Sequence, residues 1–498
     1  MQHAEMAFSA ARLSKPPSEH VQQFYQLPAL QRERRQFDQF SKIDLAHAVM
    51  LVEQGIVTAE VGRQLLPTLL EIRTLGYDGL GVDPARGSLL FQIEAFLASK
   101  VGEDAAGALH TARSRIDQSA TARRLFKRDG LIRVMAGILE LTDVLIEVAE
   151  RHSSTIMPSY THMQQAQPGN FGHYVLSFAS RLEADFDRCL EILVRVNQSP
   201  LGAVGLSGTS WPINRDRTAE LLGFDGIVYN SKLGREAYYA AEIAACLSLV
   251  MSDLNDLATD LHIWSSSEFA LVELDDSYCS TSSIFPQKKN PVTLETIKAA
   301  AGPAVTWFAT ALATFRGEGT GDQAIRAVSL LDPAFDTVAN MLELSAGIMA
   351  TLKVHERRME EILDASWSTS SNLADVLVQS HGLSFRQAHH VVGRFVRIAM
   401  ADNISRGQAG TELLCRASRE TIGSDLKISG IELAAALDPR EFVRTRISAG
   451  SVGPTEVSHM LGRSKISLSD NRSKLDRRRL QFSQAEEMLA EAVRRIVA

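Results

Sequence analysis

The chain has 498 residues, 45% of which are hydrophobic, and its formal net charge is −7. This length allows several domains with substantial cores, and the mildly acidic balance, without long runs of like charge, argues against nucleic-acid binding. No apolar run is long enough for the core of a signal peptide or for a membrane-spanning helix. The four cysteines are widely spaced and form no CxxC pair, which argues against a disulfide framework or a zinc site. We therefore expect a cytoplasmic protein that interacts with neither nucleic acid nor membrane.

The first 111 residues predict an N-terminal helical domain. They contain short helical segments, with the Gly- and Asp-rich link "LGYDGLGVDPARG" at 75–87. The following residues differ, because their apolar positions recur over much longer segments.

Two heptad patterns in the middle of the chain predict long helices. Apolar residues recur at steps of three and four across 175–196 and again across 243–264. Two further long segments cover 290–316 and 332–364, and Pro303 predicts a kink in the first of them. Together these segments predict a central bundle of long helices.

The last part of the chain predicts a third helical domain. It begins with the Ser-rich stretch "SWSTSSN" and ends on a long charged helix, and no convincing β segment precedes it. The sequence therefore predicts an all-α fold with three helical domains, at 1–111, 112–364 and 365–498, of which the middle one is the long bundle.

The stretch "STSSIFPQKKNP" at 280–291 interrupts the apolar segments with a polar loop. Asn290 and Pro291 are residue types preferred at the N-cap and at the first position of a helix. A helix N-terminus attracts anions through its unpaired N–H groups, and Lys288 and Lys289 add positive charge there. An ordinary capped helix with solvated lysines has the same composition. An ordinary capped helix does not explain why two serines lie next to this positive charge, where a hydroxyl can be activated as a base.

This segment also resembles a known family signature. "SSIFPQKKNP" is similar to the signature loop of the fumarase/aspartase superfamily, with Phe285 where methionine is usual. Other stretches are similar to segments of the argininosuccinate lyase family: "GALHTARSRIDQSATARRL" (107–125), "YTHMQQAQPGNFGHY" (160–174), "SPLGAVGLSGTSWPINRDRTAELLGF" (199–224) and "SAGSVGPTEV" (448–457). The likeness covers nearly the whole chain, with the motifs in family order.

The resemblance implies an enzyme that cleaves a C–N bond in an N-substituted aspartate and releases fumarate, without a metal or an organic cofactor. It implies that Ser282 is the general base that removes a proton from the carbon next to a substrate carboxylate. The residues it assigns to the site are the catalytic Ser282, His162, Thr161, Lys288 and Asn290, and the substrate-binding Ser114, Arg115, Ile116, Ser283, Gln164, Thr320, Ile325 and Val328.

The resemblance also implies separate roles within this set. Lys288, Asn290 and Thr161 would stabilise the dianion that forms when the proton leaves, because two negative charges then lie on one carboxylate. Arg115 would anchor a substrate carboxylate through two parallel hydrogen bonds, with the help of Ser114. The family combines its motif regions from three subunits of a homotetramer, so the resemblance implies shared active sites.

The histidines and the second arginine of these motifs are less clearly assigned. His162 would assist proton transfer or orient a neighbour, since Thr161 before it and the Ala-Gln-Pro triplet after it match the family segment. An isolated histidine more often fills a core or a surface. Arg113 is equally compatible with a structural role, and His110 is interpreted as structural.

The sequence departs from the family at several substrate contacts. Ile116 stands where the family has an asparagine. Thr320, Ile325 and Val328 stand where argininosuccinate lyases have a tyrosine, a glutamine and a lysine that grip the arginine half of the substrate. Polar groups left unpaired in a closed site cost about 1–3 kcal/mol each, so a less polar wall disfavours that substrate.

We therefore hypothesise a lyase that acts on another N-substituted aspartate, or that adds an amine to fumarate. One alternative is a genuine argininosuccinate lyase of arginine biosynthesis with a drifted pocket. A second alternative is a catalytically inactive, crystallin-like homologue.

Overall fold

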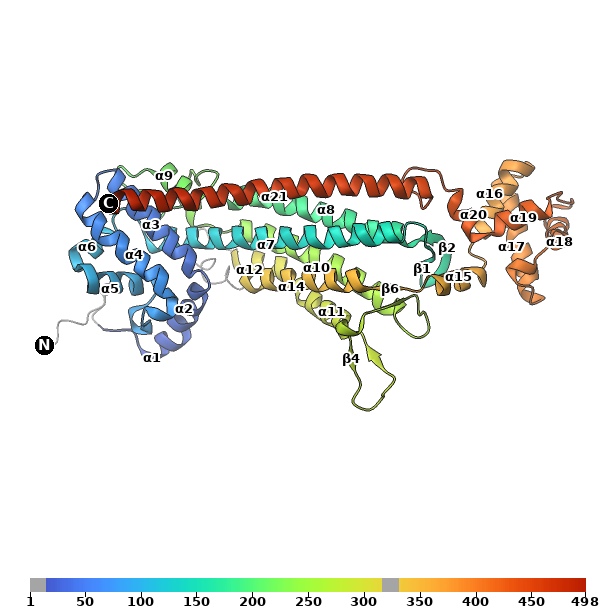
Figure 1. Ribbon diagram of the computed structural model, residues 1–498, viewed down its shortest axis with the longest axis horizontal. Coiled ribbons are helices and arrows are strands. Elements are labelled where there is room, and N and C mark those ends of the chain that lie inside the picture. Colours follow the sequence, from blue (N-terminus) through green and yellow to red (C-terminus); the bar gives the residue numbers. More distant parts are fainter. Residues whose placement is uncertain (1–14, 316–330) are drawn as a thin grey trace.

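The computed structural model describes residues 15–315 and 331–498. A bundle of helices runs along the long axis of the molecule, and a smaller helical region lies at each end of it (Figure 1). The bundle contains α7 (Arg115–Arg151), α8 (Phe171–Val196), α10 (Tyr239–Trp264), α14 (Asp332–Thr351) and α21 (Pro454–Val497). The predicted all-α class with a long central bundle is confirmed.

The two heptad patterns lie on α8 and α10, and both are confirmed as core-facing. Every position of both patterns is buried in one continuous core, which α7 and α14 complete: Val175, Phe178, Leu182, Phe186, Cys189, Leu193 and Val196 on α8, and Ile243, Leu247, Val250, Leu254, Leu257, Leu261 and Trp264 on α10. Burying a large apolar side chain contributes about 1.5–3 kcal/mol, so these two stripes supply much of the stability of the bundle.

The predicted kink at Pro303 is also confirmed. α11 (Val292–Ala304) ends one residue after the proline, and α12 (Trp307–Phe315) begins after a short break. Proline removes a backbone donor and clashes with the preceding turn, so a helix bends or breaks beside it.

The N-terminal domain contains short helices with their own core. They are α1 (Glu19–Val21), η1 (Gln22–Gln26), α2 (Leu27–Arg34), α3 (Phe37–Glu53), α4 (Ala59–Gly79), η2 (Pro84–Arg86), α5 (Leu89–Val101) and α6 (Glu103–Ala108). Phe40, Leu65, Leu89 and Leu97 are buried in this core.

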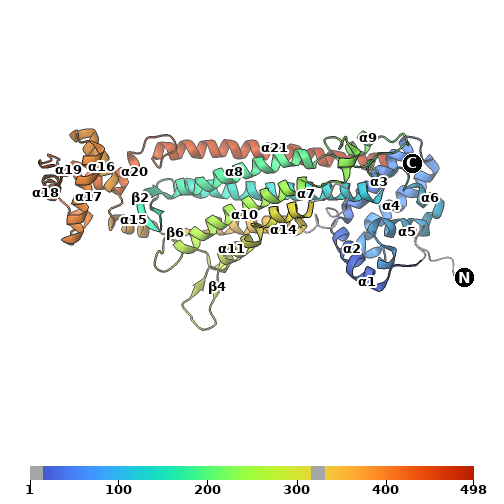
Figure 2. The same cartoon turned by 180° about the vertical axis from the view of Figure 1, so that it is seen from behind.

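The C-terminal helix α21 runs along the bundle and ends against the N-terminal domain (Figures 1 and 2). Leu461 and Leu468, in its first half, are buried in the core of the bundle. Leu489 and Val493, near its end, are buried in the core of the N-terminal domain. This one helix therefore joins the two parts of the molecule.

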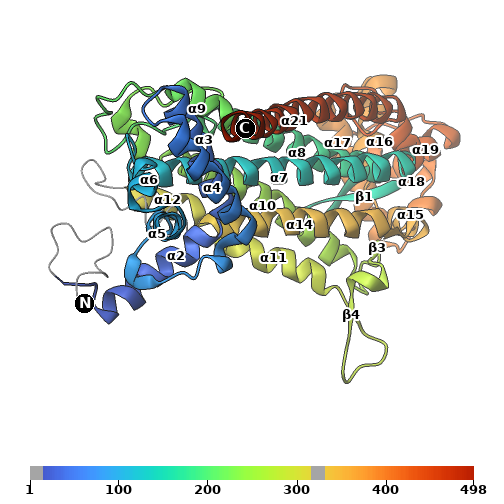
Figure 3. The same cartoon turned by 60° about the vertical axis from the view of Figure 1, so that its left-hand side comes forward.

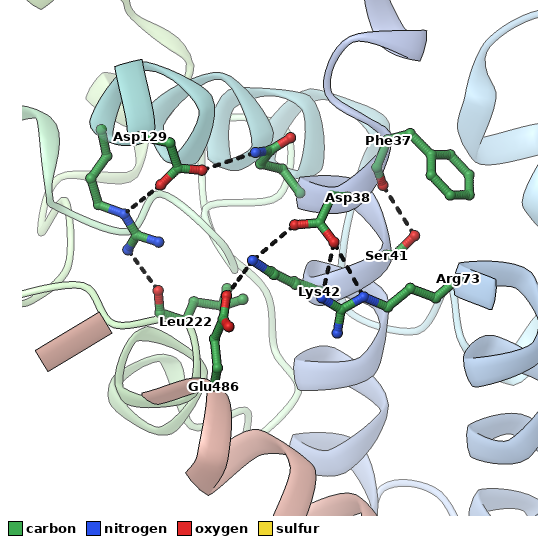
Figure 4. A network of polar contacts seen from close by, with 10 residues as sticks. Phe37, Asp38, Ser41, Lys42, Arg73, Asp129, Leu222 and Glu486 are labelled. Atoms are coloured by element: carbon green, nitrogen blue, oxygen red, sulfur yellow. Dashed lines mark hydrogen bonds and ion pairs between the residues drawn. The ribbon is translucent and has the colours of Figure 1, made fainter. Parts of the chain in front are cut away.

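Ion pairs reinforce this junction (Figure 4). The Lys42 ammonium contacts a carboxylate oxygen of Asp38 at 2.8 Å and also contacts Glu486 of α21. Asp38 in turn accepts a hydrogen bond from Arg73 at 2.9 Å, so α3, α4 and α21 share one charge network. Because the Lys42 side chain is only 15% exposed, solvent screens these pairs less than a fully exposed pair.

A small domain at the far end has a separate core. The helices of this core are α16 (Ser370–His381), α17 (Phe385–Ala401), α18 (Thr411–Ile422) and α19 (Gly430–Leu437). α15 (Glu356–Asp364) and α20 (Pro439–Arg444) lie beside it and pack their buried Leu363, Phe442 and Val443 with Ile156 in a small separate cluster. The division into three domains stays a prediction. The structure adds that residues 365–498 contain two parts, because α21 packs with the bundle and not with this core.

Three short antiparallel strand pairs interrupt the helices, and the sequence did not predict them. β1 (Ile156–Thr161) pairs with β2 (Gln164–Asn170), β3 (Val272–Glu273) with β6 (Lys353–Val354), and β4 (Ser280–Thr281) with β5 (Lys289–Asn290). The shorter elements α9 (Arg215–Leu221), η3 (Ser231–Arg235) and η4 (Asp276–Tyr278) lie in the remaining connections. Across the described residues, no helix is both long and apolar enough to span a membrane.

Candidate active site

Ser114 and Arg115 lie at the N-terminus of α7, at one end of the bundle. The Ser114 hydroxyl accepts a hydrogen bond from the Ile116 N–H at 3.2 Å, and Asp117 Oδ1 accepts one from the Ser114 N–H at 2.8 Å. This capping box leaves the Ser114 O–H proton available for donation, and the Arg115 side chain is exposed beside it. A helix N-terminus also carries partial positive charge, so this position suits a carboxylate.

Asp117 holds a neighbouring loop against the start of α7. Its Oδ2 accepts hydrogen bonds from the N–H groups of Gly202 and Val204, each at 2.9 Å. Burial raises the pKa of Asp117, and the backbone donors around it oppose that shift. The segment that begins at residue 199 is thereby fixed next to Ser114.

Arg113 has a structural environment, which is one of the two roles that the sequence left open. Its buried guanidinium pairs with Asp44 at 2.5 Å, and the Gln118 amide donates to the same carboxylate at 2.7 Å. His47 Nε2 lies 2.9 Å from the Thr111 carbonyl oxygen. Burial lowers the pKa of His47 to about 3, so the ring is neutral and its N–H donates to that carbonyl.

His110 lies in the wall of a pocket. From the sequence it was interpreted as structural. Its Nδ1 is 2.6 Å from the carboxylate of Glu94, whose side chain is only 3% exposed. The pocket is lined by Phe91, Glu94, Gly107, His110, Ser114, Arg115 and Ile116. The sequence gave no sign of Glu94, because the pairing depends on how α5 packs against the segment before α7.

A second pocket adjoins the first on the other side of Arg115 and Ile116. Its lining also includes Arg32, Glu33, Gln36, Ser88, Ser119 and Arg123, which come from α2, the turn before α3, the start of α5 and α7. Glu33 Oε2 accepts a hydrogen bond from the Leu89 N–H at 2.6 Å. These polar residues of the N-terminal domain were not among the residues that the sequence assigned to the site.

Thr161, His162 and Gln164 lie at the exposed tip of the β1–β2 hairpin. Thr161 pairs with Gln164, so His162 and Met163 form a two-residue turn. Their φ angles are 55° and 59°, which is the left-handed conformation that a tight turn of this kind requires at both positions. Residues other than glycine, asparagine and aspartate rarely adopt the left-handed conformation, because it strains their backbone. Backbone strain of this kind is concentrated at functional sites.

Ser282 lies at the start of the loop between β4 and β5. Its hydroxyl oxygen accepts hydrogen bonds from the N–H groups of Ile284 at 3.2 Å and Phe285 at 3.0 Å. Two aligned backbone donors stabilise negative charge on that oxygen, as in an oxyanion hole. Ser283, by contrast, is exposed next to it. The geometry therefore favours Ser282 over Ser283 as the activated hydroxyl.

The two lysines of this loop have different environments. Lys289 Nζ lies 2.8 Å from Glu273 and 2.6 Å from Asp276. Burial lowers the pKa of Lys289, but the two carboxylates outweigh burial and raise this pKa above its usual value. Lys288 is exposed and has no ion pair among the residues that the structure describes. Its charge is therefore available to a ligand, whereas that of Lys289 orders the loop.

The predicted helix cap at Asn290 is wrong. Asn290 lies in β5, where it pairs with Ser280, and α11 begins at Val292 with Pro291 as its N-cap residue. The N-cap position has no side-chain hydrogen bond. The pairing of β4 with β5 uses the asparagine backbone, which shifts the start of the helix by one residue.

The three segments lie apart within one chain. α7 has 37 residues and, at 1.5 Å per residue, is about 55 Å long. Arg115 is at its start and the β1–β2 hairpin follows its end, and the β4–β5 loop projects from the bundle (Figures 1 and 3). Among the described residues, no hydrogen bond or ion pair joins any two of these segments. One chain therefore does not assemble the whole set.

Part of the assigned set cannot be placed. Thr320, Ile325 and Val328 lie outside the described residues. Within 15–315 and 331–498, no group of three or more His, Cys, Asp or Glu side chains has the geometry to hold a metal ion.

Comparison with known proteins agrees with these motifs. The lyase family model matches residues 41–305, and the model of the argininosuccinate lyase C-terminal region matches residues 367–444. The argininosuccinate lyase of Methanocaldococcus jannaschii is 34% identical over 90% of this chain and 91% of its own length. That of Methanosarcina acetivorans is 34% identical over 97% of each chain.

Among solved structures, EDDS lyase in complex with formate superposes with a TM-score of 0.87 at 31% identity, covering 97% of both chains. A variant of EDDS lyase with bound fumarate gives the same TM-score at 32% identity. The protein is a carbon–nitrogen lyase that forms fumarate. By its family models and its close relatives, the chain belongs to the argininosuccinate lyase family of the fumarase/aspartase superfamily.

Proposed function

We propose that the protein eliminates an amine from an N-substituted aspartate other than argininosuccinate, and releases fumarate. The observation that carries the elimination is the environment of Ser282. Its oxygen accepts hydrogen bonds from two backbone N–H groups in a loop that also presents Lys288, which has no ion pair within the described part of the chain. That combination supports an alkoxide that acts as a base. A substrate other than argininosuccinate is favoured by the sequence at Thr320, Ile325 and Val328, which stand where argininosuccinate lyases have a tyrosine, a glutamine and a lysine.

The reaction begins with the succinyl group bound at the start of α7. Arg115 binds one carboxylate through two parallel hydrogen bonds, and the Ser114 hydroxyl donates to the same group. Ile116 closes this position with an apolar surface. The second carboxylate then faces the loop that carries the base.

Proton removal is the difficult step, because the carbon acid is weak. The Ser282 oxygen takes the proton from the carbon next to the second carboxylate and becomes a neutral hydroxyl. The electron pair moves into that carboxylate, which then carries two negative charges. Lys288, Asn290 and Thr161 stabilise this dianion, and such preorganised donors contribute about 3–4 kcal/mol each at other sites.

The C–N bond then breaks as the carbon–carbon double bond of fumarate forms. The bonding electrons leave with nitrogen, which takes up a proton. His162 assists this transfer, and its neighbour Gln164 can hold the leaving amine through its side-chain amide. The reverse sequence adds an amine to fumarate.

The proposal requires several chains, because about 55 Å separates the ends of α7. We propose a homotetramer in which each site combines segments from three subunits. Exposed apolar side chains on the outer surface of the bundle support association. Leu249 on α10 is 45% exposed, and Phe308 and Leu312 on α12 are 43% and 45% exposed. Val305 between α11 and α12 is 78% exposed, and a cluster of this kind is typical of a protein interface.

A panel of substrates tests the activity. Argininosuccinate and a series of N-substituted aspartates are compared by following fumarate absorbance. We expect at least one other compound to have a higher kcat/KM than argininosuccinate. Ready turnover of argininosuccinate alone would instead identify a genuine argininosuccinate lyase.

The same assay separates the enzyme from an inactive homologue. Ser282→Ala should abolish fumarate release. The matched control is Ser277→Ala, since Ser277 lies in η4, shortly before β4, and among the described residues its hydroxyl donates a hydrogen bond only to Asp275. Fumarate release that stays at the same background rate in the wild type and in Ser282→Ala would favour the inactive, crystallin-like alternative.

A further inference from the structure

Two aspartates meet inside the bundle, where α8 packs against α10. Asp185 lies on α8 next to the apolar stripe, and its side chain is fully buried. Asp253 lies on α10, its side chain is only 13% exposed, and its carboxylate is within hydrogen-bonding reach of that of Asp185. Neither aspartate is part of the candidate active site, so their pairing needs a separate explanation.

The buried carboxylate of Asp185 has too few hydrogen-bond donors. Its Oδ1 accepts a hydrogen bond from the Arg188 guanidinium at 2.6 Å. Its Oδ2 is buried and has no hydrogen-bond partner among the described residues. A buried carboxylate oxygen without a donor is unfavourable, and a second carboxylate beside it adds repulsion. A proton on one of the two carboxyl groups removes both effects, because it cancels one charge and donates to the other group.

The two arginines of α8 at this cluster do not bridge the aspartates. Arg188 pairs with Asp185 and extends towards solvent. Arg181 pairs with Asp253 and, at 2.8 Å, with the half-exposed Asp256. Among the described contacts, neither guanidinium binds both Asp185 and Asp253. The arginines therefore leave the gap between the two buried carboxyl groups without a donor.

The other helices packed against α8 bring no charge to Asp185. From Leu131 onward, the buried side chains of α7 are apolar apart from Thr142. α21 contributes Lys474, but its ammonium lies 3.9 Å from the exposed Asp187 instead. Within the described part of the chain, the charged neighbours of Asp185 are thus the groups on α8 and α10 already named.

Two buried thiols complete the titratable surroundings. The sulfurs of Cys189 on α8 and Cys246 on α10 are 3.3 Å apart, and the Cys246 sulfur is 4.0 Å from the backbone carbonyl oxygen of Asp185. The hydrogen bond with Cys246, together with burial, raises the pKa of Cys189 well above its usual value. This thiol is therefore neutral at physiological pH and does not compete for the charge of the aspartates.

We propose that Asp185 and Asp253 share one proton between α8 and α10, and that loss of this proton near neutral pH weakens the packing of the bundle. With the proton in place, the two carboxyl groups form a hydrogen bond between the helices. Without it, two negative charges face each other in a buried position.

The direction of the pH dependence follows from the proton balance. Burial and the Asp253 carboxylate raise the pKa of Asp185 from 3.8 to about 7, although Arg188 opposes the shift. Between these two values the folded chain holds a proton that the unfolded chain has lost. The contribution of this group to stability is therefore complete below pH 3.8, falls as the pH rises towards 7, and is level above it.

Asp185→Asn tests the shared proton, because asparagine has nearly the same shape and stays neutral at every pH. Between pH 5 and 8, the folding equilibrium of the wild type should weaken about a hundredfold relative to that of the variant, since about two pH units lie between 5 and the raised pKa. In a chain of this length, the thermal midpoint of the wild type should then fall by about 3 °C relative to the variant. His47 is present in both proteins, so its own titration cancels in this comparison.

Two variants on α10 locate the effect. Asp256→Asn is the matched control, because Asp256 pairs with the same Arg181 but is half exposed; it should keep the pH dependence of the wild type. Asp253→Asn removes the second carboxylate and should reduce the pH dependence.

The outcomes decide the proposal. Thermal midpoints of the wild type and Asp185→Asn that run parallel from pH 5 to 8 would overturn it. If Asp185→Asn does not fold, a pH dependence in Asp253→Asn equal to that of the wild type would overturn it instead.

Discussion

Mixing two inactive variants tests whether the active sites are shared between chains. Arg115→Met removes the carboxylate anchor, and Ser282→Ala removes the base. Each variant alone carries its defect in every site, so each should be inactive. In one chain, Arg115 and the hairpin that carries His162 are separated by the length of α7, about 55 Å, which no dicarboxylate can span.

The expected recovery follows from counting the hybrid sites. Suppose that the anchor and the base of one site come from different subunits. In an equal mixture, the subunit that supplies the anchor has an intact Arg115 half of the time, and the subunit that supplies the base has an intact Ser282 half of the time. About a quarter of the sites then have both groups, so the mixture should regain about a quarter of the wild-type activity. If one chain supplied both groups, every site would keep a defect and the mixture would stay inactive.

The assay co-expresses the two variants, or unfolds and refolds them together, and follows fumarate release. Each variant taken through the same treatment alone is the control, and size-exclusion chromatography checks that hybrids of the same size form. Formation of hybrids without any recovery of activity would refute the shared site.

Three further predictions follow from contacts around the site. Lys288→Met should lower kcat by about 10²–10³-fold, because a preorganised charge is lost. Lys289→Met, whose partners Glu273 and Asp276 precede β4 in the chain, should instead mainly lower the thermal midpoint; steady-state kinetics and thermal denaturation distinguish the two, and equal losses of kcat would contradict this division. Glu94→Gln should raise KM several-fold with little change in the melting temperature, since Glu94 orients His110 in the pocket wall; an unchanged KM would show that the pair is only structural. The pKa of His47 is lowered to about 3 in the folded chain, against 6.5 normally, so its contribution to stability is complete above pH 6.5 and is lost as the pH falls below it. Between pH 7.5 and 5 the free energy of unfolding of the wild type should therefore fall by about 2 kcal/mol more than that of His47→Gln, as measured by denaturant titration, and an equal fall in both proteins would contradict the assigned pKa.

The long helices could be predicted because their signal is local. The apolar stripes of α8 and α10 repeat within each helix, and every one of their positions is buried. The kink at Pro303 has the same origin, since a proline acts on its own turn. Such features do not depend on what the rest of the chain does.

The β1–β2 hairpin could not be predicted for a physical reason. Its turn residues, His162 and Met163, are not the glycine or asparagine that announce a two-residue turn. Its strands also lack a regular alternation of apolar and polar residues. The motif was therefore recognised by its likeness to a family and not by its conformation.

The start of α11 was predicted wrongly because two local preferences competed. Asn290 is a good N-cap residue, but its backbone pairs with Ser280 instead, and strand pairing decided the boundary. Sequence alone cannot weigh a bond to a residue ten positions away against a cap.

The parts of the candidate site that were missed depend on tertiary packing. Glu94 meets His110, and Arg32 and Ser88 line the same pocket, only because separate helices of the N-terminal domain converge beside α7. Likewise, nothing in the sequence shows that α21 turns back to bury Leu489 in that domain. Long-range contacts of this kind carry no local pattern.

A structure of the assembled protein with fumarate bound tests the central claim most directly. The account predicts that the Ser282 oxygen lies within contact distance of a methine carbon of fumarate, with Arg115, Thr161 and His162 contributed by other chains around the same molecule. A bound fumarate that no Ser282 of the assembly approaches, with the β4–β5 loop ordered elsewhere, would contradict both the base and the shared site.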